Sequence, residues 1–155
     1  DFRGRAVALT FIYTNCPDVC PLIAEKLRRA HESLPESDRD RVALVAVTVD
    51  PARDTPEALH AFSERHRLAA NAQWYALTGD HAALAPVWQA YYIDPGTMID
   101  DAPHDTNHEH ATATSTTLAH TDAIFIIDPD GKERVLLRAD VDPAVIAADL
   151  QALIG

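Results

Sequence analysis

Two nearly continuous apolar runs, residues 6–13 and 42–49, constrain most strongly how this chain can fold. A strand of a parallel sheet that is covered on both faces is apolar at successive positions, whereas a half-exposed strand alternates. Each run is followed by a helical pattern, and Pro21 and Pro56 stand near the expected helix starts, where a missing N–H is tolerated. The two runs therefore predict central strands of an α/β sheet that is flanked by helices.

The rest of the chain supplies the elements that complete such a sheet. We expect further strands at residues 73–77, 123–127 and 134–137. The last two form an antiparallel hairpin around a turn at 128–131, in which Gly131 takes a positive φ. The resulting order is β-α-β-α-β-α-β-β-α, with a terminal hairpin and helix. This order is that of a thioredoxin-like α/β fold, with a central mixed sheet flanked by helices, in a single domain over residues 1–155.

Periodicity and capping residues place the helices. The first is expected over residues 21–34, followed by a polar turn at 35–38, and the last begins behind Asp142. Thr55 and the turn at 78–80 precede the other two. The side chains expected to face the core, helix by helix, are Leu22, Ile23, Leu27 and Ala30; Leu59, Phe62 and Leu68; Leu84, Val87, Trp88 and Tyr91; Val145, Ile146, Leu150 and Leu153.

Residues 94–118 have no periodicity and are rich in Asp, Thr, Pro and His, so we expect a loop excursion there. The segment contains His104, His108 and His110, and a His-rich tract can bind metal weakly. We expect a polar loop with incidental affinity for metal, which is dispensable for tight binding.

The formal net charge of −11 comes from 24 acidic and 13 basic residues. Nucleic acids and anionic lipids would be repelled by such a chain, so we expect neither as a partner. The charge suits the binding of cations or of basic protein faces, and solubility alone would also explain it. No apolar run approaches the roughly twenty residues that a membrane span needs.

All the cysteine of the chain lies in one short segment, T-N-C-P-D-V-C-P at residues 14–21. Cys16 and Cys20 stand between an expected core strand and a helix N-terminus, where the helix dipole favours thiolate over thiol. Thiolate is both the nucleophile of disulfide exchange and a soft ligand for Cu(I) or Zn(II). The spacing of three residues allows either a disulfide or a shared metal ion, and the alternative is a pair of small buried apolar residues. Pro21 is expected to begin the helix, with Cys20 at its cap.

Four stretches of this chain together resemble the Sco/SenC family, thioredoxin-fold proteins that assemble the dinuclear copper site of cytochrome c oxidase. They are T-N-C-P-D-V-C-P at 14–21, T-V-D-P-A-R-D-T at 48–55, Y-A-L-T-G at 75–79 and A-H-T at 119–121. The resemblance covers nearly the whole chain apart from residues 94–118. Family members carry an N-terminal membrane anchor and a short hairpin before this point, so we expect the chain to be a fragment that lacks both.

The resemblance implies a copper metallochaperone that holds Cu(I) or Cu(II) through Cys16, Cys20 and His120. His120 stands at the entrance to the strand at 123–127, beside the cysteine turn in a thioredoxin-like sheet, and a capping His bonded to the backbone is the alternative. The implied partner is the copper-bearing subunit of cytochrome c oxidase, with other copper chaperones or thioredoxin-like reductases as further partners. The implied location is the periplasmic, extracytoplasmic face of a bacterial inner membrane.

A second function uses the same cysteines without copper. In a thiol–disulfide oxidoreductase that reduces the copper-ligand cysteines of the oxidase subunit, Cys16 would attack and Cys20 would resolve. Such a protein is an enzyme, whereas a chaperone has no turnover. His120 discriminates the two, because a dithiol reductase commonly has Pro at that place. A peroxidase fits less well, since neither cysteine has an adjacent Arg in the sequence.

The remaining polar candidates have structural alternatives. Asp50 and Asp54 flank the end of the strand at 42–49, where a carboxylate could orient His120 or a bound water, or could instead be a solvent-facing cap. The other histidines are expected to face solvent or to be bonded locally, and they are His31, His60, His66 and His81.

Overall fold

The computed structural model describes residues 2–95 and 122–155. Within these residues one mixed sheet has the strand order β3-β2-β1-β4-β5. The strands are β1 (Ala6–Ile12), β2 (Val42–Thr48), β3 (Trp74–Leu77), β4 (Ala123–Ile127) and β5 (Glu133–Arg138). The first three run parallel, β4 is antiparallel to β1, and β5 is antiparallel to β4. The apolar runs at 6–13 and 42–49 thus form the paired strands β1 and β2, which lie inside the sheet.

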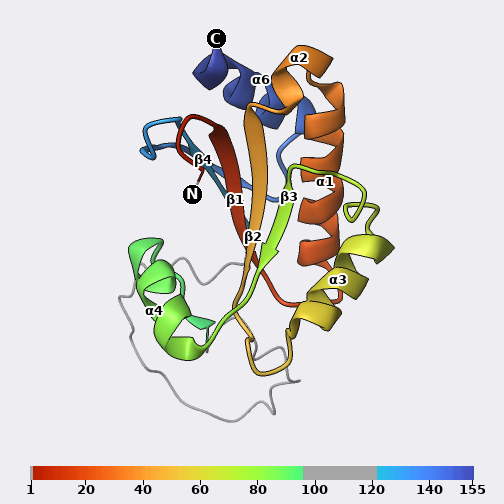
Figure 1. Ribbon diagram of the computed structural model, residues 1–155, viewed down its shortest axis with the longest axis vertical. Coiled ribbons are helices and arrows are strands. Elements are labelled where there is room, and N and C mark those ends of the chain that lie inside the picture. The colour runs from red at the N-terminus through yellow and green to blue at the C-terminus, as the bar shows by residue number, and fades with distance from the viewer. Residues whose placement is uncertain (1, 96–121) are drawn as a thin grey trace, which may run out of the picture.

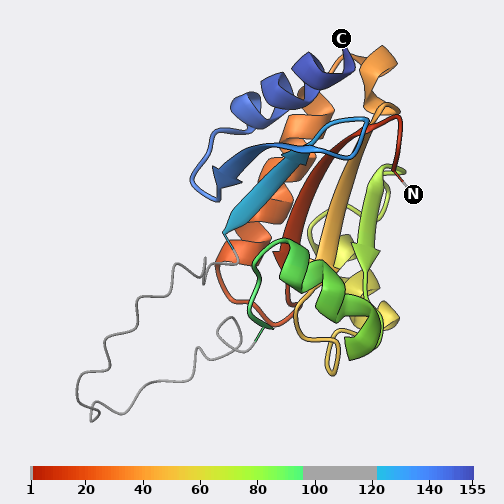
Figure 2. The ribbon, with the colours of Figure 1, turned by 90° about the vertical axis from the view of Figure 1, so that its left-hand side faces the viewer.

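Helices cover both faces of the sheet (Figures 1 and 2). The helices are α1 (Val19–Ser33), α2 (Glu36–Arg39), α3 (Pro56–Arg65), α4 (His81–Ala90) and α6 (Pro143–Ile154). The helices α1, α3 and α6 lie on one face, and α4 lies on the other (Figure 2). The predicted fold class, a mixed sheet flanked by helices, is confirmed.

The core has two layers because successive side chains of a strand point to opposite faces. In β1, Ala6 and Ala8 pack in the layer that contains α1 and α6. Val7, Leu9 and Phe11 pack in the layer that contains α4. Continuous apolar character in β1 therefore reflects burial on both sides, as the sequence predicts.

The expected turn and cap chemistry is present at several element ends. Thr55 Oγ1 accepts a hydrogen bond from Ala58 N at 3.2 Å, and Asp142 Oδ1 accepts one from Ala144 N at 2.8 Å. Gly131 has φ +83° in the β4–β5 turn, a conformation that side chains disfavour. Within residues 2–95 and 122–155, no helix is long and apolar enough to cross a membrane.

Three local predictions are wrong. The helix α1 begins at Val19 rather than Pro21, so Cys20 lies inside its first turn instead of capping it. Proline is accepted there because first-turn N–H groups have no intrahelical partner. Leu22 and Val145 are 43% and 44% exposed, although both were expected to face the core. Each precedes a fully buried isoleucine by one residue, which corresponds to a rotation of about 100° away from the buried stripe. The polar turn at 35–38 also includes the short helix α2.

Candidate functional site

The two cysteines lie where β1 passes into α1, at the carboxyl end of the parallel strands. Cys16 N donates to Tyr13 O at 3.1 Å, which closes a tight turn after the strand. Cys20 N donates to Cys16 Sγ at 3.3 Å, so the first turn of α1 holds the outer sulfur. Cys16 is 7% exposed and Cys20 is fully buried, and both are free thiols. The predicted single turn that brings the two residues together is present.

The two sulfurs share a proton unequally. A hydrogen bond from the Cys20 thiol lowers the pKa of Cys16 to about 5, and backbone N–H groups of Asp18 and Cys20 add to this against the opposing effect of burial. The same hydrogen bond, together with burial, raises the pKa of Cys20. At neutral pH the pair therefore carries one thiolate, on the outer sulfur, and one thiol, on the inner sulfur. Thiolate is the form that attacks disulfides and binds soft metal ions.

A buried carboxylate lies directly behind the cysteine turn. Asp54 is 1% exposed, and its Oδ1 accepts from Thr14 N at 3.0 Å and from Thr14 Oγ1 at 2.6 Å. Its Oδ2 accepts from Thr48 Oγ1 at 2.5 Å. The reading of Asp54 as a solvent-facing cap is therefore wrong. The roles of Thr14 and Thr48 were not predicted from the sequence, although a threonine at the end of an otherwise apolar strand is a signal for Thr48.

Asp50 is also buried, which excludes the solvent-facing alternative for it as well. Its carboxylate pairs with Arg53 Nη1 at 2.7 Å, and its N–H donates to Thr48 Oγ1 at 2.9 Å. The loop after β2 is thus tied to the end of the strand by side chains as well as by backbone. The predicted orientation of His120 by either carboxylate stays a prediction.

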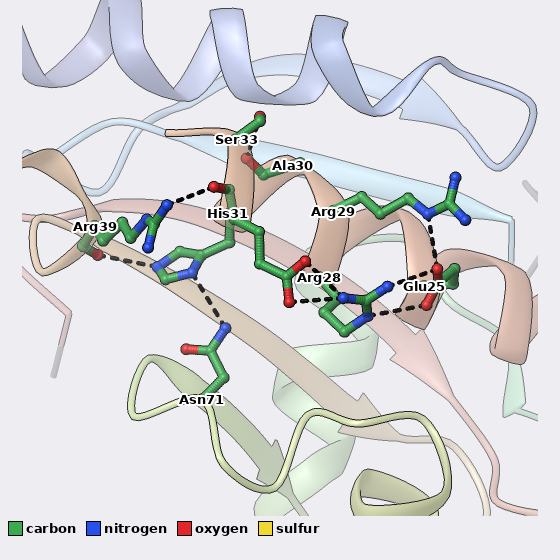
Figure 3. A network of polar contacts seen from close by, with 9 residues as sticks. Glu25, Arg28, Arg29, Ala30, His31, Ser33, Arg39 and Asn71 are labelled. Atoms are coloured by element: carbon green, nitrogen blue, oxygen red, sulfur yellow. Dashed lines mark hydrogen bonds and ion pairs between the residues drawn. The ribbon is translucent and has the colours of Figure 1, made fainter. Parts of the chain in front are cut away.

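The histidines of the described residues lie away from the cysteine turn or have other contacts. His31 is buried, with Nε2 at 3.1 Å from Arg39 O and Nδ1 at 3.2 Å from Asn71 Nδ2 (Figure 3). His60 is exposed and lies 3.5 Å from Glu64 Oε1. His81 is exposed and contacts the Trp88 ring. These three agree with the expectation of solvent-facing or locally bonded side chains.

His66 departs from that expectation. Its ring packs against Phe62 with centroids 4.5 Å apart, and Nε2 is a buried atom without a hydrogen-bond partner among the described residues. Burial lowers the pKa of His66, and the neighbouring Arg65 charge lowers it further. The residue caps the C-terminus of α3, so its position is set by the end of that helix.

The third predicted ligand, His120, lies outside the described residues, as do His104, His108 and His110. Among residues 2–95 and 122–155, no group of three or more His, Cys, Asp or Glu side chains is placed to hold a metal ion. The described part of the site is the pair Cys16 and Cys20, a two-sulfur set to which a further ligand can be added.

The fold and the thiol pair define a class: a thioredoxin-like domain with a dithiol turn at the carboxyl edge of its sheet. Within that class, the chain belongs to the SCO1/SenC family, whose sequence profile matches residues 1–155. A protein of Stutzerimonas stutzeri, provisionally named as copper-binding, is 32% identical over 139 residues, which are 88% of this chain and 60% of that protein. The mitochondrial SCO2 homologue of Bos taurus is 31% identical over 132 residues, 84% of this chain and 44% of that protein. The chain thus spans about half the length of these relatives.

Solved structures give the same relationship. The copper-bound ScoI of Bradyrhizobium japonicum superposes with a TM-score of 0.67 at 28% identity, covering 98% of this chain and 87% of that one. The apo Sco1 of Thermus thermophilus superposes with a TM-score of 0.70 at 28% identity, covering 98% of this chain and 81% of that one. The predicted family resemblance is confirmed.

Proposed function

We propose that this chain is a copper metallochaperone that helps assemble the dinuclear copper site of cytochrome c oxidase, with copper as its cargo. The observation that carries the proposal is the pair of free, buried cysteines at the edge of a SCO1/SenC domain, where Cys20 N donates to Cys16 Sγ at 3.3 Å. A relative named as a copper-binding protein and a copper-bound structural neighbour support the choice of metal. Thiolates favour Cu(I), and an added imidazole makes Cu(II) accessible.

Cys16, Cys20 and His120 are the proposed ligands. Loading one copper ion onto the sulfurs releases the proton that Cys20 holds, because a ligating thiol is deprotonated. A Cys16–Cys20 disulfide has no thiolate to offer, so oxidation and copper loading exclude one another. The short loop that such a disulfide closes adds little chain-entropy stabilisation, so the fold should persist in both states.

Copper titration of the reduced protein tests the proposal. We expect one copper ion per chain and, for Cu(II), an intense sulfur-to-copper charge-transfer band. The variants Cys16→Ser and Cys20→Ser should lose tight binding and the band. Retention of both by either variant would show the assignment to be wrong. In a companion variant, His104, His108 and His110 are replaced by Ala. This variant should keep the tightly bound copper ion and lose at most a weakly bound second one.

A second candidate is a thiol–disulfide oxidoreductase that reduces the copper-ligand cysteines of the oxidase subunit. The observation that favours it is the unequal burial of the two free cysteines, with Cys16 7% exposed and Cys20 fully buried, which suits an attacking and a resolving sulfur. The lowered pKa of Cys16, caused by the Cys20 hydrogen bond, agrees with that assignment. His120→Ala separates the candidates. A chaperone should lose Cu(II) binding and support of oxidase assembly, while a reductase should retain its function.

The proposed partners and location follow the family. The client is the copper-bearing oxidase subunit, and other copper chaperones or thioredoxin-like reductases are further proposed partners. We place the protein on the extracytoplasmic face of a bacterial inner membrane. The net charge of −11 would favour a basic docking face on the client, an attraction that salt should weaken.

A further inference from the structure

We propose that Asp54 is a positioning residue for the thiol pair, acting through Thr14. The carboxylate joins two loops that lie at the carboxyl ends of neighbouring parallel strands, in which Ile12 pairs with Thr48. One loop contains the cysteines and the other begins α3. The inference deepens the proposed function by assigning what holds its site in place, and only its copper measurement rests on that function.

The geometry of the contact suits a clamp. Both the backbone N–H and the hydroxyl of Thr14 donate to the same oxygen of Asp54, which fixes the main chain and side chain of Thr14 together. Thr14 lies two residues before Cys16, whose own N–H closes the turn onto Tyr13 O. Fixing Thr14 therefore fixes the start of the turn that carries the outer sulfur.

Asp54 is itself held from the other side. Its Oδ2 accepts from Thr48 Oγ1, and its backbone N–H donates to Asp50 O at 2.8 Å. Thr48 is in turn fixed by its place in β2 and by Trp88 Nε1, which donates to Thr48 O at 3.0 Å. The clamp thus connects the loop after β1 to β2 and, through Thr48, to α4.

The energetics explain why the residue must act as a polar clamp rather than as core filling. A buried carboxylate is unfavourable unless it is hydrogen-bonded, and an apolar side chain of similar size would pack without that penalty. Hydrogen bonds from a hydroxyl or N–H to a carboxylate are short and about twice as strong as neutral ones. Three such bonds fix the orientation of the Asp54 carboxylate as well as stabilising it, and two of the three come from Thr14 in the cysteine loop.

The experiment compares two substitutions that each remove one hydroxyl from the same carboxylate. Thr14→Val removes the hydroxyl on the cysteine side. Thr48→Val removes the one on the strand side, together with the acceptor of the Asp50 N–H, and serves as the control that removes at least as many hydrogen bonds outside the cysteine loop. Thr14→Ser keeps the hydroxyl and serves as the rescue. Asp54→Asn completes the set, and if it fails to fold, the threonine variants still decide the question.

The main measurement needs no copper. The reduced protein is equilibrated with oxidised and reduced dithiothreitol. As the Cys16–Cys20 disulfide forms, the cyclic disulfide takes two electrons from the two sulfurs, one proton from the Cys20 thiol and one proton from water, and becomes the dithiol. A clamp that holds the two sulfurs within reach raises their effective concentration. We expect Thr14→Val to lower the equilibrium constant for disulfide formation about tenfold, the size expected from one hydrogen bond to a charged group.

Thr48→Val should change that constant by less than about twofold at a comparable loss of thermal stability, and Thr14→Ser should restore the parent value. Equal effects of Thr14→Val and Thr48→Val would overturn the proposal, because a purely structural role for Asp54 predicts them. An unchanged constant in Thr14→Val would overturn it as well.

A competition titration with a Cu(I) chelator supplies the second measurement, in which Thr14→Val should weaken copper binding more than Thr48→Val does. If the parent protein binds no copper, the proposed function fails, while the disulfide equilibrium still decides the role of Asp54.

Discussion

The two ends of the sheet both bury side chains of types that proteins use as metal ligands, in or next to α1, but the surroundings of these side chains differ. At the amino end, His31 of α1 uses both ring nitrogens, one with Arg39 O and the other with Asn71 (Figure 3). The Asn71 amide is itself oriented, because its Oδ1 accepts from Gln73 N at 2.9 Å. His31 Nδ1 therefore accepts and Nε2–H donates. At the carboxyl end, the Cys20 thiol donates to Cys16 Sγ, which also accepts from backbone N–H groups of the first turn of α1.

The difference separates a structural residue from a chemical one. A buried polar group with fixed partners at every donor and acceptor gains nothing by exchanging them, so it stabilises one conformation. Two thiols that share one proton can exchange that contact for a disulfide or a metal ion. Burial and residue type alone do not distinguish these cases, whereas the chemistry of the partners does. His31 bonds to a carbonyl and an amide that do not react with it, and each thiol lies beside a second sulfur with which it can form a disulfide.

The largest expected effect comes from removing a sulfur. Cys20→Ser should abolish tight copper binding and intramolecular disulfide formation, because an alcohol is a poor substitute for the soft thiolate ligand. His31→Ala should leave both properties intact. Mass spectrometry after oxidation and copper titration of the two variants measure this, and a His31→Ala variant that loses copper would break the comparison.

The next effect concerns pH. With its pKa near 5, Cys16 should be about 100 to 1 thiolate at pH 7, against about 1 to 100 for a thiol at its ordinary value of 9.0. Alkylation of reduced, copper-free protein by iodoacetamide should therefore stay fast down to about pH 5. In Cys20→Ala the profile should shift upward, because the side-chain donor that lowers the pKa of Cys16 is removed.

The same shift has a consequence for stability. The folded-state pKa of Cys16 lies below its unfolded value, so the stabilisation is fully present above about pH 9 and is lost as the pH falls through about 5. The raised pKa of Cys20 acts in the opposite direction, because its contribution is lost as the pH rises above its ordinary value. A Cys16 alkylation rate that follows an ordinary thiol profile would contradict the unequal sharing of the proton.

His31, both of whose ring nitrogens are hydrogen-bonded, should affect the stability of the fold but not copper binding or disulfide formation. His31→Ala leaves Arg39 O and the Asn71 amide without their partner and should lower the free energy of unfolding by about 2 kcal/mol. The exposed His60→Ala is the control, with an expected change within about 0.5 kcal/mol. Urea unfolding monitored by circular dichroism measures both, and equal effects would show that the hydrogen bonds of His31 contribute little.

The smallest expected effect is on stability and concerns His66, a third buried side chain. His66 has a buried Nε2 without a partner in the described part of the chain, yet it has no thiol chemistry beside it. His66→Phe should raise stability by about 1 kcal/mol, since an unsatisfied polar atom is replaced by an apolar ring.

The gain should be greater at pH 5 than at pH 7. Burial lowers the pKa of His66, so the unfolded parent chain takes up a proton more readily as the pH falls below about 6.5. Melting temperatures at the two pH values test this, and a destabilised variant would indicate that the ring nitrogen has a role.

Features that depend on neighbours along the chain were predictable from the sequence. The caps at Thr55 and Asp142 span three residues or fewer, the strands follow from apolar runs, and the cysteine turn follows from a strand beside a helical pattern. The clamp at Asp54 was not predictable, because Thr14 lies 40 residues away and reaches it only through the pairing of β1 with β2. The exposure of Leu22 was not predicted. Neighbouring residues of a helix point about 100° apart, so the sequence pattern does not decide which residue at the edge of the buried face of α1 is exposed.

Because the two sulfurs are unequally buried, only one of them is accessible from solvent. A molecule that arrives from solvent can reach Cys16, whereas Cys20 is enclosed by the first turn of α1 and the core. Any exchange, of a metal ion or of a disulfide, should therefore begin at the outer sulfur while the inner one is still engaged. Transfer would then proceed in a fixed order through a half-released state, and the direction of that order is built into where the helix begins.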